Sequence, residues 1–237
     1  MKKTVSEFRE MLKTVPPLLL TLTVLAVVGM NLLANKSIVN LDWLALDAGI
    51  LLSWMAFLTM DVLTHCYGPR AATLFSFFAL LLNLLMAGIF FAASRVPGMW
   101  GESFVEGSEQ IINTALDNTF GGTWYVLLGS SVAFLVSALV NNFLNYGIGT
   151  LLKRRDSFGQ FALRSYVSTF IGQFVDNLLF ALIVSKVFFG WTLLQCFTCA
   201  VTGAVAELVF EIVFSPLGYR ISKRIKARQT VSEGAAA

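Results

Sequence analysis

A carboxylate stands in the middle of a long apolar stretch of this chain, residues 164–190. This residue is Asp176. It belongs to a series at four-residue spacing with a hydroxyl residue, a glycine that leaves a gap, and an aromatic ring: Ser168, Gly172 and Phe180. Such spacing places the four residues on one helix face. A carboxylate near the centre of a bilayer-spanning helix costs about 2.5–3.5 kcal/mol on insertion scales. We therefore expect Asp176 to have a functional role.

Further polar side chains lie in the other apolar stretches. Asp61 and His65 are one helical turn apart, and so are Glu207 and Glu211. Amide and hydroxyl side chains accompany them: Asn83, Ser130, Ser137, Asn141, Asn145, Gln173, Asn177 and Thr202. Lipid cannot satisfy these groups, so they are expected to face a common interior.

Several of these residues also have a purely structural interpretation. Asn and Ser side chains can link helices, at about 0.6 kcal/mol per contact. Glu211 and Asp61 can each pair near the surface with an arginine: Arg164, Arg70 or Arg220. His65, beside Asp61, can relay a proton, contact a ligand or form an internally satisfied pair. The sequence leaves these alternatives open.

Enzymatic motifs are missing from the sequence. There is no Gly-x-x-x-x-Gly-Lys loop for ATP and no His-Glu-x-x-His metal spacing. Cys196 and Cys199 are interpreted as small packing residues. We predict no catalytic residue, metal or cofactor. An acidic, amide-rich and aromatic interior suits the binding of a flat, polar small molecule.

Composition indicates an all-α integral membrane protein. The 237 residues are 57% hydrophobic and 13% charged, with a mean hydropathy of +0.74. About 20 apolar helical residues cross the hydrocarbon core. Six segments reach that length, at about 17–34, 46–66, 71–94, 124–147, 164–188 and 191–217. We expect a six-helix transmembrane domain over residues 17–219, with 1–16 before it and a basic tail at 220–237.

The basic residues predict the orientation. Of the 17 Lys and Arg residues, three lie in the connections on one side: Lys36, Arg95 and Lys186. The others lie in the termini and in the remaining connections. The positive-inside rule then places both termini in the cytoplasm. The net charge of +3 reflects these anchors and does not indicate nucleic-acid binding.

The connections differ in length. Tyr67-Gly68-Pro69-Arg70 predicts a tight turn between the second and third spans. Residues 36–45 are expected to form a short amphipathic connection with Trp43 as an interface anchor. Residues 95–122 are expected to form a separate amphipathic helix on the membrane surface, with a hinge at Gly121-Gly122. Residues 230–237 are expected to be disordered.

Two motifs carry a resemblance to a known family. The first is Ala48-Gly49-Ile50-Leu51, followed by Thr59-Met60-Asp61-Val62-Leu63-Thr64 and closed by Tyr67-Gly68 and Arg70. The second is Ser168-Thr169-Phe170-Ile171-Gly172-Gln173-Phe174-Val175-Asp176-Asn177. With the six-span layout, they make the chain resemble the queuosine-precursor transporters, also described as the vitamin uptake transporter (VUT) family. The chain departs from that family's pattern at His65, commonly Glu, and at Asn177, more often Thr.

The resemblance implies uptake of 7-deazaguanine bases, the precursors of queuosine in tRNA, across the bacterial cytoplasmic (inner) membrane. It also implies a fold similar to the substrate-binding subunits of energy-coupling-factor vitamin transporters. Asp176 can accept hydrogen bonds from the ring N–H and the amino group of a guanine-like edge. Gln173 can complement the carbonyl of that edge. The expected substrate-binding residues are Asp176, Gln173, Asn177, Asp61, His65, Glu207, Asn141, Trp54 and Phe180.

Two other functions stay open at this point. The chain can be the substrate-binding subunit for another small polar nutrient, working with a separate ATPase module. It can also be an intramembrane enzyme, or a scaffold in which Asp61, His65 and Glu207 form a structural network. The expected partners are a purine-like small molecule and the lipid bilayer, with no nucleic acid. A homo-oligomer, an energy-coupling module and the source of transport energy all remain open.

Overall fold

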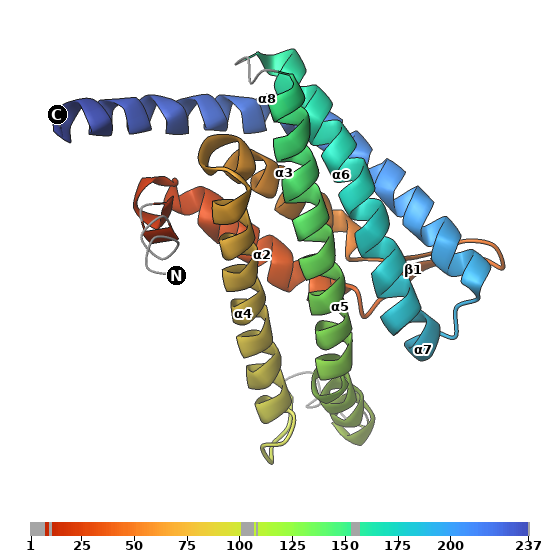
Figure 1. Ribbon diagram of the computed structural model, residues 1–237. Helices are drawn as coiled ribbons and strands as arrows, with labels where there is room; N and C mark the ends of the chain where they lie inside the picture. The colour runs from red at the N-terminus through yellow and green to blue at the C-terminus, as the bar shows by residue number, and fades with distance from the viewer. Residues whose placement is uncertain (1–7, 10, 101–106, 108, 153–156, 237) are drawn as a thin grey trace.

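The computed structural model describes residues 8–9, 11–100, 107, 109–152 and 157–236. Its long helices are α2 (Pro17–Leu33), α3 (Ile50–Tyr67), α4 (Pro69–Ala93), α5 (Glu109–Leu151), α6 (Phe158–Phe180) and α8 (Leu193–Ala236). A π-helical turn, η2 (Ala181–Ser185), and the short α7 (Lys186–Phe188) follow α6. The strands β1 (Ser37–Asn40) and β2 (Ala45–Asp47) complete the order. Figure 1 shows the long helices packed side by side.

Among the described residues, five helical segments are long and apolar enough to cross a membrane: Ile50–Tyr67, Pro69–Ala93, Gln110–Leu151, Phe158–Phe188 and Leu193–Gln229. A shorter apolar helix, Pro17–Leu33, has 17 residues, which is about the minimum for a spanning helix. The predicted spans each fall on one of these segments, so the chain is a multi-pass helical membrane protein.

A tight turn joins α3 and α4, as predicted. Gly68 ends α3 with a φ of 84°, and Pro69 opens α4 at its first position. The positive φ favours glycine, and proline suits the first helical turn because its missing N–H has no intrahelical acceptor there. The two helices therefore turn back on each other within a few residues.

The connection between α2 and α3 is a short β-hairpin. The two strands pair antiparallel, with Ser37 opposite Asp47 and Asn40 opposite Ala45. α8 holds this hairpin, because Thr198 donates to the Trp43 carbonyl at 2.6 Å and Gln195 donates to the Leu41 carbonyl at 2.8 Å. Backbone pairing within residues 37–47 replaces the continuous helix expected from residue 46. We call this side of the bundle the hairpin end.

The connection between α4 and α5 differs as well. α5 begins at Glu109 and continues without a break to Leu151, so the predicted hinge at Gly121-Gly122 and the separate surface helix are wrong. The helical spacing predicted for residues 111–120 is confirmed. Backbone hydrogen bonds of a long helix outweigh the cost of about 1 kcal/mol for each glycine. Residues 102, 104 and 106 of the same prediction lie outside the described part of the chain.

The last helix also extends further than expected. α8 continues to Ala236, which corrects the prediction of a disordered end, and it contains Pro216. Proline removes one helical hydrogen bond and favours a kink. Figure 1 shows the dark-blue end of α8 running at a steep angle to the lighter-blue part of the helix. The strong helix formers among residues 220–229 extend the helix beyond the apolar span.

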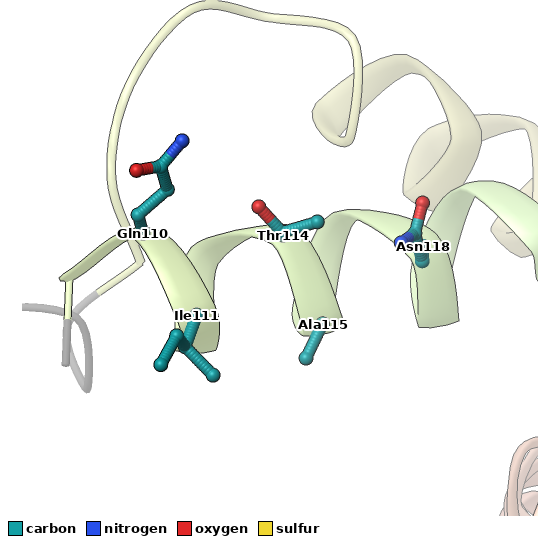
Figure 2. Close-up of a pocket in the computed structure, with 5 residues that line it drawn as sticks. All are labelled: Gln110, Ile111, Thr114, Ala115 and Asn118. Carbon is teal, nitrogen blue, oxygen red and sulfur yellow. The ribbon is translucent and has the colours of Figure 1, made fainter.

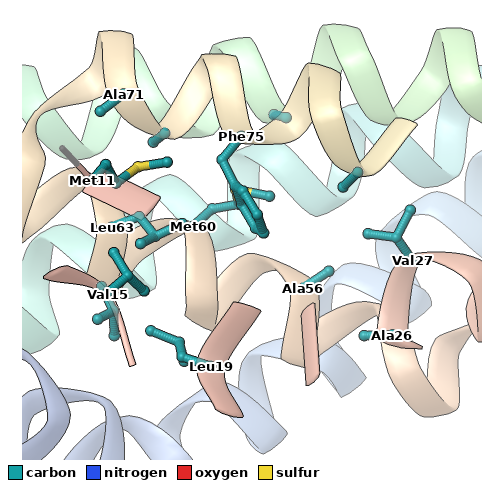
Figure 3. Close-up of a cluster of buried hydrophobic side chains, with 14 of the residues drawn as sticks. Met11, Val15, Leu19, Ala26, Val27, Ala56, Met60, Leu63, Ala71 and Phe75 are labelled. Carbon is teal, nitrogen blue, oxygen red and sulfur yellow. The ribbon is translucent and has the colours of Figure 1, made fainter. Parts of the chain in front are cut away.

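The largest apolar core lies at the opposite side, which we call the terminal end because residues 11–15 and the later part of α8 meet there. Figure 3 shows Met11, Val15, Met60, Leu63 and Phe75 meeting in this core, from the N-terminal segment, α3 and α4. Ile225, from the basic end of α8, belongs to the same cluster and is fully buried. The N-terminal segment and the C-terminal helix thus pack together against the start of the bundle.

Candidate functional site

Asp176 lies on α6, facing α5. The Ser137 hydroxyl on α5 donates to Asp176 Oδ1 at 2.7 Å, and the side chain of Asp176 is partly exposed. Gly172, one turn earlier, provides the close approach of α6 to its neighbours: a Cβ there would lie 2.9 Å from the Phe57 ring and 3.0 Å from Asn141 Cβ. The predicted gap on this helix face is therefore filled by side chains of α3 and α5.

Glu207 on α8 faces the same region from the other side of the bundle. Its side chain is fully buried. Ser53 of α3 donates to Oε1, and Asn177 of α6 donates to Oε2 at 3.1 Å. The carboxylate thus joins α3, α6 and α8. Because Asn177 follows Asp176 directly, the two predicted acidic residues lie at one site.

Asp47 belongs to this site, although the residue patterns of the sequence did not single it out. It ends β2 and accepts a hydrogen bond from the Gly49 N–H at 2.8 Å. Electrostatic interactions link it with Asp176 and with Glu207. We call Asp47, Asp176 and Glu207 the hairpin-end acidic cluster. The Asp-Ala-Gly turn before a helix was the available signal, but only the tertiary fold brings it beside α6 and α8.

Asp47 predicts a pH dependence of stability. Burial raises its pKa from 3.8 to about 6, and the Gly49 N–H opposes that shift. Since the folded state binds the proton more tightly, the stability from this group is fully present below pH 3.8 and is lost as the pH rises through about 6. Acidification from about pH 7 to about pH 5 should therefore raise the melting temperature of the wild type more than that of Asp47→Asn, measured in detergent. Equal responses would contradict this, and exposed Asp42→Asn should respond as the wild type does.

A second group of acids consists of Glu211, one turn further along α8 than Glu207, and Asp61 of α3. Asp61 on α3 is fully buried and accepts hydrogen bonds from Asn141 at 2.8 Å, from Thr169 at 3.1 Å and from Ser165. The same Ser165 hydroxyl lies 2.6 Å from Oε1 of Glu211. We call the two acids Asp61 and Glu211, together with the Ser165 hydroxyl that joins them, the serine-linked pair.

Among the described residues, Glu211 pairs with no arginine, the structural alternative that the sequence left open. Its contact is the Ser165 hydroxyl, and its Oε2 is buried without a hydrogen-bond partner among the described residues. Arg164 interacts electrostatically with Asp61 instead, and its guanidinium lies over the Phe161 ring at 5.5 Å. Ser165 follows Arg164 on the same turn of α6, and it is the Ser165 hydroxyl that contacts Glu211.

Gln173 connects the two groups along α6. It lies four residues after Thr169, which binds Asp61, and four before Asn177, which binds Glu207. Its side chain is fully buried, yet neither Nε2 nor Oε1 has a hydrogen-bond partner in the part of the chain that the structure describes. A buried amide without partners costs about 1–3 kcal/mol for each polar atom. Such an amide is available for a ligand.

Other predicted site residues lie elsewhere. His65 Nε2 lies 2.7 Å from Lys226 Nζ, and its ring meets Phe161 edge-on. Trp54 stacks on Phe210 and Phe214 of α8, with ring centroids at 5.6 and 4.4 Å. Phe180 packs in an apolar cluster with Ala34, Val126, Ala133 and Val184. These three side chains make packing and terminal-end contacts, whereas Asn141 binds Asp61.

Figure 2 shows a shallow pocket on the first turns of α5. It is lined by Gln110, Ile111, Thr114, Ala115 and Asn118. These residues belong to a single helix and carry no charge, so the pocket supplies none of the polar chemistry of the acidic groups. Cys196 and Cys199 pack beside Ala45 and Trp191. Within the described residues, no group of three or more His, Cys, Asp or Glu side chains is placed to hold a metal ion.

Fold and site define a class: a multi-pass membrane protein whose helices enclose linked acidic and amide side chains. Comparison with protein families identifies the family to which the chain belongs. The chain belongs to the family described as "Putative vitamin uptake transporter", whose profile matches residues 47–221, about three quarters of the sequence. Membership indicates a transporter with a small-molecule substrate in a lipid environment. No curated protein and no solved structure matches the chain.

Proposed function

We propose that this chain takes up a queuosine precursor, a 7-deazaguanine base, across the bacterial cytoplasmic membrane. One observation carries the proposal: the unpartnered amide of Gln173 lies on α6 between the contacts to Asp61 and Glu207, as far as the described residues extend. A guanine-like edge presents N–H donors beside a carbonyl acceptor. Carboxylates can accept from those donors, and the Gln173 amide can donate to the carbonyl.

Asp176, Glu207 and Gln173 have the central roles in this proposal. Ser137 donates to one oxygen of Asp176, so the second oxygen is assigned to the substrate. Asn177 holds Glu207 in place. The family membership and the two resemblance motifs support a flat, polar nutrient as the substrate. The distribution of basic residues supports an orientation with the hairpin end outside and both termini in the cytoplasm.

The test is uptake in a bacterial strain that neither makes queuosine nor takes up its precursors. The chain would be expressed there, and tRNA queuosine would be measured after each 7-deazaguanine base is fed separately. We expect one base to restore queuosine. No restoration by any base, with the protein inserted in the membrane, would overturn the substrate assignment. It would favour another flat nutrient, or a binding subunit that needs a separate ATPase module.

Gly203 offers a test that leaves the acidic residues unchanged. A Cβ at this position of α8 would lie 2.6 Å from Asn177 Nδ2, the end of a flexible side chain. Gly203→Ala should therefore fold but turn Asn177 away from Glu207. A hydrogen bond to a charged group contributes about 1.5–3 kcal/mol. Because Asn177 acts only through Glu207, we expect affinity for the base to fall by about tenfold, the lower limit of that range, in equilibrium binding to the purified protein.

The control for this substitution is Gly88→Ala on α4. A Cβ there would meet nothing within 4 Å among the described residues, so binding should match the wild type. Unchanged affinity in Gly203→Ala would show that the contact between Asn177 and Glu207 does not shape the site.

A further inference from the structure

The serine-linked pair has too few hydrogens for two ionised acids. The Ser165 hydroxyl lies within hydrogen-bond distance of Asp61 Oδ2 and, at 2.6 Å, of Glu211 Oε1. A hydroxyl has one hydrogen to donate, and an ionised carboxylate only accepts. An O–H···O contact of about 2.5–2.7 Å is typical of a charge-assisted hydrogen bond. One of the two carboxyl groups must therefore supply the second hydrogen.

The surroundings indicate which acid holds that hydrogen. Asp61 accepts from Asn141 through Oδ1 and from Thr169 through Oδ2, in addition to Ser165. These donors stabilise its ionised form. Among the described residues Glu211 has only the Ser165 hydroxyl at Oε1, and its Oε2 is buried without a partner. The arrangement is Glu211 O–H donating to Ser165 Oγ, whose own hydrogen is donated to Asp61.

We propose that Asp61, Ser165 and Glu211 form a proton-binding site, with Glu211 as the proton carrier that couples proton movement to transport. In the transfer step the Glu211 O–H bond breaks and a new O–H bond forms at Ser165 Oγ. The original Ser165 O–H bond breaks, and its hydrogen forms a bond to Asp61 Oδ2. One proton moves from Glu211 to Asp61, and the serine hydroxyl is regenerated. The coupling part of this proposal rests on the proposed function; the bound proton does not.

The charged groups on the helices around the pair can be named one by one. α3 contributes His65 as well as Asp61, and α8 contributes Glu207, one turn from Glu211. α6 contributes Arg164, which interacts with Asp61, and Asp176 further along. α5 has no charged residue between 118 and 151. His65 is held toward Lys226, so a histidine relay from Asp61 is replaced here by a serine relay to Glu211.

Glu207 gives the pair a connection to the substrate site. Like charges at i and i+4 of a helix repel each other. While Glu207 is ionised, repulsion keeps the proton on Glu211. A substrate whose N–H groups bind Glu207 offsets that charge, so Glu211 can then release its proton. Transport of the substrate and loss of the proton are thereby linked through one turn of α8.

The first experiment needs neither a substrate nor a substitution. Infrared spectroscopy of the membrane-reconstituted wild type detects the C=O stretch of a protonated carboxylic acid. Glutamate labelled with ¹³C shifts that band only if a glutamate carries the proton. We expect a shifted component near neutral pH. Its absence would overturn the proposal, whether or not a 7-deazaguanine base is transported.

Two variants assign the band. Glu211→Gln should remove the labelled component, and its amide N–H can still donate to Ser165. Glu207→Gln should weaken the component without abolishing it, because the neutral side chain no longer repels the charge of an ionised Glu211. Persistence of the full band in Glu211→Gln, or its complete loss in Glu207→Gln, would overturn the assignment to Glu211.

Coupling is tested in proteoliposomes with the base that the uptake experiment identifies. An inward proton gradient should accelerate wild-type uptake severalfold. Glu211→Gln should lose that acceleration but retain exchange of labelled for unlabelled base, a split that a purely structural role would not produce. Equal acceleration in Glu211→Gln would overturn coupling. If the variant does not fold, Ser165→Ala provides the same comparison by removing the hydroxyl that joins the two acids.

Discussion

Asp176→Asn is expected to lower affinity for the transported base by about 10–100-fold and to leave the protein as stable as the wild type. The reduction follows from the loss of a charged acceptor, because a hydrogen bond to a charged group contributes about 1.5–3 kcal/mol. Folding should be unaffected, since asparagine retains an oxygen that accepts from Ser137 at the 2.7 Å contact. Removal of one charge also relieves repulsion with Asp47 and Glu207, which interact with it electrostatically.

Equilibrium binding and initial uptake rates of purified, reconstituted protein measure this effect, and thermal unfolding in detergent measures stability. Asp42→Asn is the matched control, because Asp42 is exposed and carries the same change of side chain. Unchanged uptake by a normally inserted Asp176→Asn protein would remove Asp176 as a ligand. A large loss of stability would instead assign it a structural role.

The sequence could predict the helices and much of the polar interior, because both follow from local rules. Apolar stretches of spanning length identify membrane helices in any fold. Spacing of four residues places side chains on one face, and the structure accordingly puts Ser168, Gly172 and Asp176 against α5. The polar interior follows from the inability of lipid to satisfy these groups.

The rest depended on contacts between segments far apart in the sequence. Asp47 joins the acidic cluster only because β1 and β2 pair and α8 holds the hairpin. His65 is drawn to Lys226 from the far end of α8, although its spacing from Asp61 suggested a relay. Glu211 contacts a serine, whereas the sequence had left pairing with an arginine open. No periodicity within one helix distinguishes these outcomes.

Asp61→Ala should destabilise the bundle by about 3–5 kcal/mol, the cost of breaking a buried charged network. The Asp61 carboxylate accepts hydrogen bonds from four side chains: Asn141 at 2.8 Å, Thr169 at 3.1 Å, Ser168 at 3.4 Å and Ser165. These donors come from α5 and α6, so one buried group on α3 links three helices. The alanine variant leaves the donors buried without this acceptor and Arg164 without its acidic neighbour.

Asp61→Asn separates the two roles of this residue. Asparagine keeps an acceptor oxygen for these donors, so most of the stability should remain, and unfolding in mixed detergent should show Asp61→Ala far below both other proteins. An Asp61→Ala protein as stable as the wild type would contradict a linking role. Because Asp61 is the fixed charge toward which the Ser165 hydrogen points, the neutral Asp61→Asn also leaves Glu211 with no anion to receive its proton. A stable but uncoupled Asp61→Asn protein is therefore expected if the carboxylate serves both packing and proton transfer.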